Sequence, residues 1–250
     1  MVSWAMENSP TAASNEKCDD AKLQADRVVP KEEWLQKWEI KNIGFHNEEG
    51  HASFKKYLDL LLNGRNGQKI FFPLCGKTIE MKWLSDLGHH VIGVEISESA
   101  LKEFFAEQNL SFTEETVAEI PGGKLFKSTT GNISLYCCSI YDLTSTITGK
   151  FDGIWDRGSL VAVNPSERER YAQLILSLMN KKCCCLLVTC EYDPRKHKGP
   201  PFYVPDSEVK SLYGKYCDIR FLEKIDSLSN RPKKWGLDYF FEVLHVLTLK

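Results

Sequence analysis

The segment of residues 69–97 constrains the fold of this chain more than any other, because it predicts one strand–helix–strand unit. Apolar runs at residues 70–72 and 91–94 indicate two buried strands. A turn with Gly76 and a helical pattern separate the two runs. The second run ends in Glu95, about 20 residues after the turn, where a carboxylate can accept hydrogen bonds from both hydroxyls of a ribose. The unit therefore predicts a site for a nucleoside-like cofactor.

Alternating strand and helix patterns continue along the chain and predict a mostly parallel sheet. We expect a hairpin within residues 124–138 and an apolar central strand at residues 183–190. The strands at residues 220–225 and 239–249 are expected to pair antiparallel, because no helix fits between them. The other expected elements are helices at residues 31–40, 51–62, 97–107, 164–180 and 206–213 and a strand at residues 151–155. The expected fold is a single Rossmann-like α/β domain with helices on both faces and an antiparallel C-terminal strand.

The chain is expected to divide into a short tail and one domain. Residues 1–28 are polar and lack periodicity, which predicts a disordered tail. Residues 29–250 are expected to form the domain, since 250 residues fit one α/β domain. The helices at residues 31–40 and 51–62 precede the first strand, so we expect them to pack over the sheet.

Composition excludes several classes of partner. A net charge of -2 gives no electrostatic case for binding nucleic acid or an anionic membrane. The first twenty residues lack the apolar core of a signal peptide, and no apolar run approaches the ~20 residues of a bilayer span. We therefore expect a cytoplasmic protein without a membrane or nucleic-acid partner, and, since no apolar surface stripe is evident, a monomer.

The nine cysteines are expected to be small buried hydrophobic residues rather than disulfides or metal ligands. Their number is odd, and there is no C-x-x-C pair. Immediate neighbours such as Cys137 and Cys138, or the three cysteines at residues 183–185, point to opposite faces of a strand. They cannot converge on one ion, so no metal site is expected.

Ligands of open α/β sheets bind at the carboxyl ends of the strands, where the strand order reverses. The loops that follow Phe72, Val94, Ser139 and Trp155 should therefore line one site.

The turn at Gly76 distinguishes between two classes of cofactor. A dinucleotide requires G-x-G-x-x-G, because its pyrophosphate approaches bare backbone. Here Gly76 stands alone between Cys75 and Lys77, which argues against a nicotinamide-dependent oxidoreductase. S-adenosylmethionine has a ribose but no phosphate, so one glycine suffices. Residues 138–142, a strand end followed by a polar turn, can supply the adenine slot.

Four motifs resemble the thiopurine S-methyltransferase family. They are Phe-Phe-Pro-Leu-Cys-Gly-Lys at residues 71–77, Gly-Val-Glu-Ile-Ser at 93–97, Ile-Trp-Asp-Arg-Gly at 154–158 and Lys-Gly-Pro-Pro-Phe-Tyr-Val-Pro at 198–205. The resemblance implies a class I methyltransferase fold and transfer of a methyl group from S-adenosylmethionine to the sulfur of aromatic and heterocyclic thiols. The product of the cofactor would be S-adenosylhomocysteine.

The resemblance also implies roles for individual residues. Residues expected at the cofactor are Trp34, Trp38, Phe45, Leu74, Gly76, Glu95, Ile96, Ser139, Ile140 and Arg157. Residues expected at the acceptor are Phe45, Arg157, Pro200, Pro201 and Arg231.

Other roles stay open for several of these side chains. Trp34 and Trp38 lie four residues apart on one helix face and can be core residues. Arg157 can pair with its neighbour Asp156, and Arg231 can be part of a solvated basic loop.

An in-line methyl transfer needs no covalent nucleophile, so we expect no catalytic cysteine or serine. Arg157 and Arg231 are expected to support a thiolate electrostatically. The alternatives are another soft acceptor, or a protein that binds S-adenosylmethionine without turnover.

Overall fold

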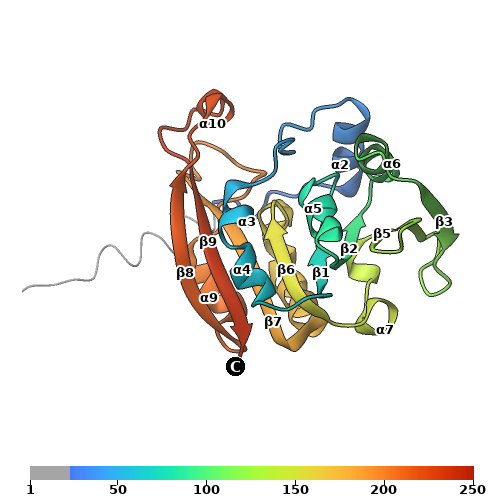
Figure 1. Ribbon diagram of the computed structural model, residues 1–250. Coiled ribbons are helices and arrows are strands. Elements are labelled where there is room, and N and C mark those ends of the chain that lie inside the picture. Colours follow the sequence, from blue (N-terminus) through green and yellow to red (C-terminus); the bar gives the residue numbers. More distant parts are fainter. Residues whose placement is uncertain (1–22) are drawn as a thin grey trace, which may run out of the picture.

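A nine-stranded sheet runs through residues 23–250, the part of the chain that the computed structural model describes (Figure 1). Its spatial order is β3-β4-β5-β2-β1-β6-β7-β9-β8. The strands are β1 Lys69–Phe72, β2 His90–Glu95, β3 Phe112–Thr116, β4 Lys124–Ser128, β5 Ile133–Cys137, β6 Phe151–Arg157, β7 Met179–Glu191, β8 Cys217–Asp226 and β9 Phe241–Leu249.

The central strands β5, β2, β1, β6 and β7 are parallel. The chain passes from β1 to β2 on one side and later returns to β6 on the other side of β1. Strand order therefore reverses at β1, which is the place where open α/β sheets bind ligands.

Both ends of the sheet are antiparallel. The hairpin within residues 124–138 is confirmed as β4 and β5, and the antiparallel C-terminal pair is confirmed as β8 and β9. The expectation that no helix separates this pair is wrong, because the five-residue helix α10 Asn230–Lys234 lies between β8 and β9. One helical turn is too short to show an apolar period. The outer strand β3 was not predicted, because four of its five residues are exposed and show no alternation.

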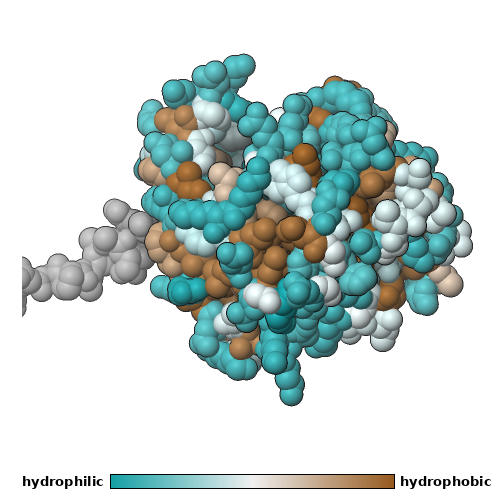
Figure 2. All heavy atoms as spheres, in the orientation of Figure 1, coloured by the Kyte–Doolittle hydropathy of each residue, from teal (hydrophilic) through white to brown (hydrophobic). Residues whose placement is uncertain are grey.

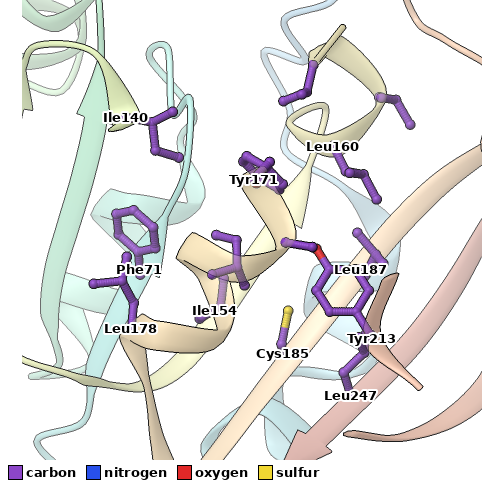
Figure 3. Close-up of a cluster of buried hydrophobic side chains, with 14 of the residues drawn as sticks. Phe71, Ile140, Ile154, Leu160, Tyr171, Leu178, Cys185, Leu187, Tyr213 and Leu247 are labelled. Atoms are coloured by element: carbon purple, nitrogen blue, oxygen red, sulfur yellow. The ribbon is translucent and has the colours of Figure 1, made fainter. Parts of the chain in front are cut away.

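Helices cover both faces of the sheet. On one face lie α8 Arg168–Leu178 and α9 Asp206–Tyr213, and Figure 3 shows Tyr171 and Leu178 of α8 beside Phe71, Ile154 and Cys185 of the strands. The other face carries α3 Ala52–Lys56, α4 Leu58–Leu62, α5 Glu80–Asp86 and α6 Glu98–Glu107. The remaining segments are α2 Lys31–Glu39, α7 Ser145–Thr148 and the 3-10 turns Ile140–Asp142, Leu160–Ala162 and Pro165–Glu167.

Two predictions about the early helices need correction. The expected helix at residues 51–62 is interrupted at Tyr57, and the residues Phe54 and Leu61 on either side of the break are both buried. The helix α2 does not pack over the sheet. It lies beside α6 at the carboxyl edge, and of the described helices that precede β1 only α3 and α4 pack over the strands.

Alternation along β7 explains the run of cysteines. Cys183 and Cys185 pack into the core cluster under α8, and Cys184 packs into the cluster on the opposite face. Of the eight described cysteines, six are buried, whereas Cys137 and Cys138 are half-buried. The expectation of small buried residues is confirmed for those six, and burial raises the pKa of Cys184 to about 11.

The expected tail ends too late in the sequence. Residues 23–28 are part of the described structure, and Gln24 is buried with its side chain hydrogen-bonded. The remainder of the expected tail, residues 1–22, lies outside the described residues. None of the helices in residues 23–250 has the length and apolar content of a bilayer span.

Candidate cofactor and substrate site

A cavity of about 660 Å³ opens at the carboxyl ends of β1, β2 and β6. The space-filling view is indented at its top, between the part that carries α10 and the part that carries α2 (Figure 2). Three of the four loops expected at one site contribute lining residues, namely those after β1, β2 and β6. Of the predicted residues, those that line the cavity are Trp34, Trp38, Phe45, Leu74, Gly76, Glu95, Ile96, Arg157, Pro200, Pro201 and Arg231.

Ser139 and Ile140 do not line this cavity. Ile140 is buried, and the Ser139 hydroxyl accepts a hydrogen bond from the amide of Tyr141 at 3.3 Å. The amide of Cys138 donates to the carbonyl of Glu95 at 3.2 Å, so the loop after β5 lies directly beside the end of β2.

The carboxylate of Glu95 is fixed by the backbone on both of its oxygens. The amide of Gly76 donates to Oε2 at 3.0 Å, and the amide of Ser97 donates to Oε1 at 2.9 Å. Burial raises the pKa of Glu95 above its ordinary value, although these two hydrogen bonds act in the opposite direction. Each carboxylate oxygen can accept a second hydrogen bond, so Glu95 retains the capacity to bind a diol.

The turn after β1 requires glycine at residue 76. Gly76 has φ +51°, and a methyl group on it would lie 2.9 Å from Cζ2 of Trp38. Leu74 also has a positive φ, of +44°, which costs about 1–3 kcal/mol for a residue with a Cβ atom. The amide of Cys75 donates to the carbonyl of Val94 at 2.9 Å, which ties the turn to the end of β2. The turn thus brings bare backbone against an indole ring.

Aromatic rings form one wall of the cavity. The ring of Phe45 meets those of Trp34 and Trp38 edge to face, with centroid distances of 5.7 Å and 5.4 Å. Trp38 is buried and Trp34 is half-buried, and both line the cavity. The two alternatives for this pair are therefore compatible, because the rings pack together and also face the cavity. Such a wall can attract a cation through the ring faces.

Arg157 is held by a network that the sequence did not indicate. Its Nη1 donates to the carbonyl of Phe45 at 2.9 Å, and its Nη2 lies 3.5 Å from Oε1 of Glu242. The other oxygen of Glu242 accepts from Ser227 at 2.9 Å and lies 3.2 Å from Nε2 of His51. Burial alone raises the pKa of Glu242, but the hydrogen bond from His51 and the charge of Arg157 outweigh it and lower the pKa to about 2.

The alternative pairing of Arg157 with Asp156 is wrong. The Asp156 carboxylate accepts the hydroxyl of Tyr171 at 2.7 Å and the amide of Leu160 at 3.1 Å. Burial raises the pKa of Asp156 to about 6, against the effect of these two hydrogen bonds. Asp156 therefore braces the loop after β6, and Arg157 faces the cavity.

Arg231 differs from Arg157 in its partners. Its guanidinium lies 5.3 Å from the ring of Trp235 and covers Gly44, where a methyl group would be 2.7 Å from Nη1. Within residues 23–250 it forms no ion pair with a carboxylate. Burial, and secondarily the charge of Arg157, lower the pKa of Arg231. Arg231 is thus a partly buried cation beside the cavity rather than a member of a solvated loop.

Comparison with known proteins agrees with this geometry. The family model described as thiopurine S-methyltransferase (TPMT) matches residues 29–250. Thiopurine S-methyltransferase of Rattus norvegicus is 58% identical over 231 residues, which cover 92% of this chain and 96% of the relative. The enzyme of Canis lupus familiaris is 55% identical over 245 residues, covering 98% of this chain and all of the relative.

Solved structures of low sequence identity share the fold. A methyltransferase of Burkholderia thailandensis, solved with 1,6-didemethyltoxoflavin and S-adenosylhomocysteine, has a TM-score of 0.55 at 15% identity and covers 97% of this chain and 93% of its own. An S-adenosylmethionine-dependent methyltransferase of Anabaena variabilis has a TM-score of 0.58 at 14% identity, covering 90% and 96%. The predicted Rossmann-like class I methyltransferase fold is confirmed.

Proposed function

The chain belongs to the thiopurine S-methyltransferase family, and we propose that it transfers the methyl group of S-adenosylmethionine to the sulfur of thiopurines and other aromatic or heterocyclic thiols. The observation that carries this proposal is the buried carboxylate of Glu95, fixed beside the single-glycine turn at Gly76 in a cavity of about 660 Å³. When bound, the cofactor supplies an electrophilic methyl group on a sulfonium.

The residues at one end of the cavity fit S-adenosylmethionine. Glu95 would bind the ribose hydroxyls, and the turn with Leu74 and Gly76 would face the methionine part. Trp34 and Trp38 would form the wall beside the cationic sulfur. We keep Ile96, Ser139 and Ile140 as the proposed adenine side, because the loop after β5 adjoins the end of β2.

The same turn is poorly suited to a pyrophosphate. Lys77 is its only cation, and the Nζ atom of Lys77 lies 3.1 Å from Oε2 of Glu103 and 2.5 Å from Oε1 of Glu107. Dinucleotide sites bind the pyrophosphate with successive glycines, and P-loops bind phosphates with a lysine as well. This turn has one glycine, and its lysine is already paired with two carboxylates. This favours the methyl donor over a nicotinamide dinucleotide.

The other end of the cavity suits a flat thiol. Pro200, Pro201, Trp235 and Phe240 give it apolar edges, and Arg231 faces the same space. The carboxylate of Glu242 neutralises Arg157, whereas Arg231 has no such partner among the residues that the structure describes. Arg231 is therefore the stronger electrostatic support for an acceptor thiolate, because a nearby cation lowers the pKa of a thiol.

No residue of the chain needs to act as a nucleophile. Cys190 lines the cavity, but burial and the neighbouring Glu242 raise the pKa of its thiol, which leaves it protonated. The protein contributes placement of the two reactants and exclusion of water, and orientation alone can supply about 7–11 kcal/mol.

We further propose that the chain acts as a monomer, since one chain supplies the residues proposed for the ribose, the methionine part and the acceptor thiol. The cytoplasm and a role in xenobiotic metabolism remain the expected setting, and residues 29–250 the proposed catalytic domain.

Two measurements test the function. Calorimetry should show binding of S-adenosylmethionine and none of NAD, and incubation with labelled cofactor and an aryl thiol should move the label to sulfur. Binding of NAD alone would overturn the cofactor assignment. Binding of S-adenosylmethionine without transfer to any aryl thiol or selenol would favour the non-catalytic alternative.

A further inference from the structure

Gln24 lies before α2 and is not among the residues that line the cavity, yet its side chain is buried and hydrogen-bonded. It is 2% exposed. Its amide nitrogen donates to the hydroxyl of Tyr192 at 2.8 Å and to the carbonyl of His197 at 2.8 Å, and its oxygen accepts from the amide of Tyr203 at 2.9 Å. We call residues 193–203 the proline loop. Tyr192 directly precedes this loop, His197 lies in its middle and Tyr203 lies at its end.

The contacts of Gln24 lead to the acceptor end of the cavity along two routes. Through Tyr192, whose hydroxyl donates to the carbonyl of Pro201 at 2.6 Å, Gln24 fixes a residue that lines the cavity. Through His197, which stacks on Trp235 with a centroid distance of 4.2 Å and an interplanar angle of 3°, it braces the ring beside the Arg231 guanidinium. The side chain of Gln24 therefore supports both Pro201 at the cavity wall and the loop that carries Arg231.

The cofactor end is held by a separate set of bonds. The amides of Gly76 and Ser97 both donate to the carboxylate of Glu95, and neither of these hydrogen bonds involves a residue of the proline loop. A change at Gln24 should thus act on the acceptor and leave the cofactor in place.

We propose that Gln24 is a positioning residue for the acceptor thiol, holding the proline loop in the form that builds the substrate wall. The inference rests on the proposed function. The segment before α2, expected from its composition to be a tail, becomes in part a component of the substrate site.

Two substitutions of Gln24, made in the whole chain, distinguish the hydrogen bonds that its side chain donates from the one that it accepts. Gln24→Ala removes all three hydrogen bonds. Gln24→Glu is nearly isosteric and keeps the acceptor for the Tyr203 amide, but it cannot donate to Tyr192 or to His197. The matched control is Ser128→Ala, which removes a buried hydroxyl that accepts the Ile133 amide at 3.1 Å in the distant β4–β5 hairpin.

The readout is the KM for an aryl thiol beside the Kd for S-adenosylmethionine. Losing two or three buried hydrogen bonds should raise the acceptor KM about tenfold in both Gln24 variants, with the cofactor Kd within about twofold of the wild type. Ser128→Ala should change neither constant. An unchanged acceptor KM in folded Gln24→Glu, or equal changes in both constants, would overturn the proposal.

Hydrogen exchange gives a second measurement that does not depend on turnover. The amide of Tyr203 and the rest of the proline loop should exchange faster in Gln24→Ala, while β1 and β2 keep their protection. Unchanged exchange in the proline loop would contradict the proposal. If the wild-type chain transfers no methyl group to any thiol, the proposed function fails instead, and the exchange result still reports on the loop.

Discussion

Replacing Glu242 with glutamine tests whether the ion-pair network at the acceptor end stabilises the fold. The carboxylate receives hydrogen bonds from His51 and Ser227 and lies 3.5 Å from a nitrogen of Arg157. These partners outweigh burial and lower the pKa of Glu242 from 4.5 to about 2. By linkage, that difference corresponds to about 3 kcal/mol of unfolding free energy at neutral pH.

The pH dependence has a definite sign. Because the folded-state pKa of Glu242 is lower than the unfolded one, its stabilisation is fully present above pH 4.5. It is lost as the pH falls through the folded-state pKa of about 2. Glutamine does not titrate, so the variant should lack this component of the pH dependence.

Urea unfolding followed by tryptophan fluorescence measures the effect. At about pH 7 Glu242→Gln should lose about 3 kcal/mol, and the gap to the wild type should narrow as the pH is lowered below about 4.5. The control is Glu191→Gln at the end of β7, whose carboxylate pairs with Lys224 at 2.7 Å on the surface. An exposed pair contributes less than about 1 kcal/mol, so this variant should stay close to the wild type. Equal losses in the two variants, or a gap for Glu242→Gln that stays constant down to about pH 3, would refute the reasoning.

Three further substitutions test the cavity itself. Glu95→Gln turns an amide NH₂ toward the Gly76 or Ser97 amide and should raise the cofactor Kd by about tenfold or more in calorimetry, whereas an unchanged Kd would remove Glu95 from the ribose site. Gly76→Ala should cost about 1–2 kcal/mol in urea unfolding and weaken cofactor binding, because the φ of +51° and the Trp38 ring both oppose a Cβ atom; a variant of native stability would contradict this. Arg231→Met should lower kcat/KM for an acidic aryl thiol about tenfold without changing the cofactor Kd, and equal rates would show that Arg231 does not support the thiolate.

Most of the fold could be predicted from local sequence patterns. The segment of residues 69–97 has its strands, turn and acid within one short stretch, so apolar runs and a single glycine were enough to predict β1, β2 and the place of Glu95. Ser97 was likewise readable as a helix cap, and its side chain accepts from the amide of Ala100 at 3.3 Å. Elements with few buried residues, such as β3 and α10, left no comparable pattern.

The hydrogen-bond and ion-pair partners of the site residues could not be predicted from the sequence for a different reason. His51 and Glu242 lie 191 positions apart, and Gln24 and Tyr203 lie 179 apart. Nothing in the local sequence distinguishes Glu242 from other acids on a strand, or Gln24 from other polar residues of a tail. Their roles depend on which strands become neighbours in the sheet, and a single sequence does not reveal that order.

The position of β9 has a consequence for how the protein forms during synthesis. Of the described strands it leaves the ribosome last, but it lies between β7 and β8 rather than at the rim. In a nascent chain β8 therefore cannot pair with the sheet until β9 has been synthesised. The ion pair between Glu242 of β9 and Arg157 also forms only at this last step. A premature stop codon within β9 would therefore remove a strand from the interior of the sheet. Both the β7–β9 and the β9–β8 pairing would be lost.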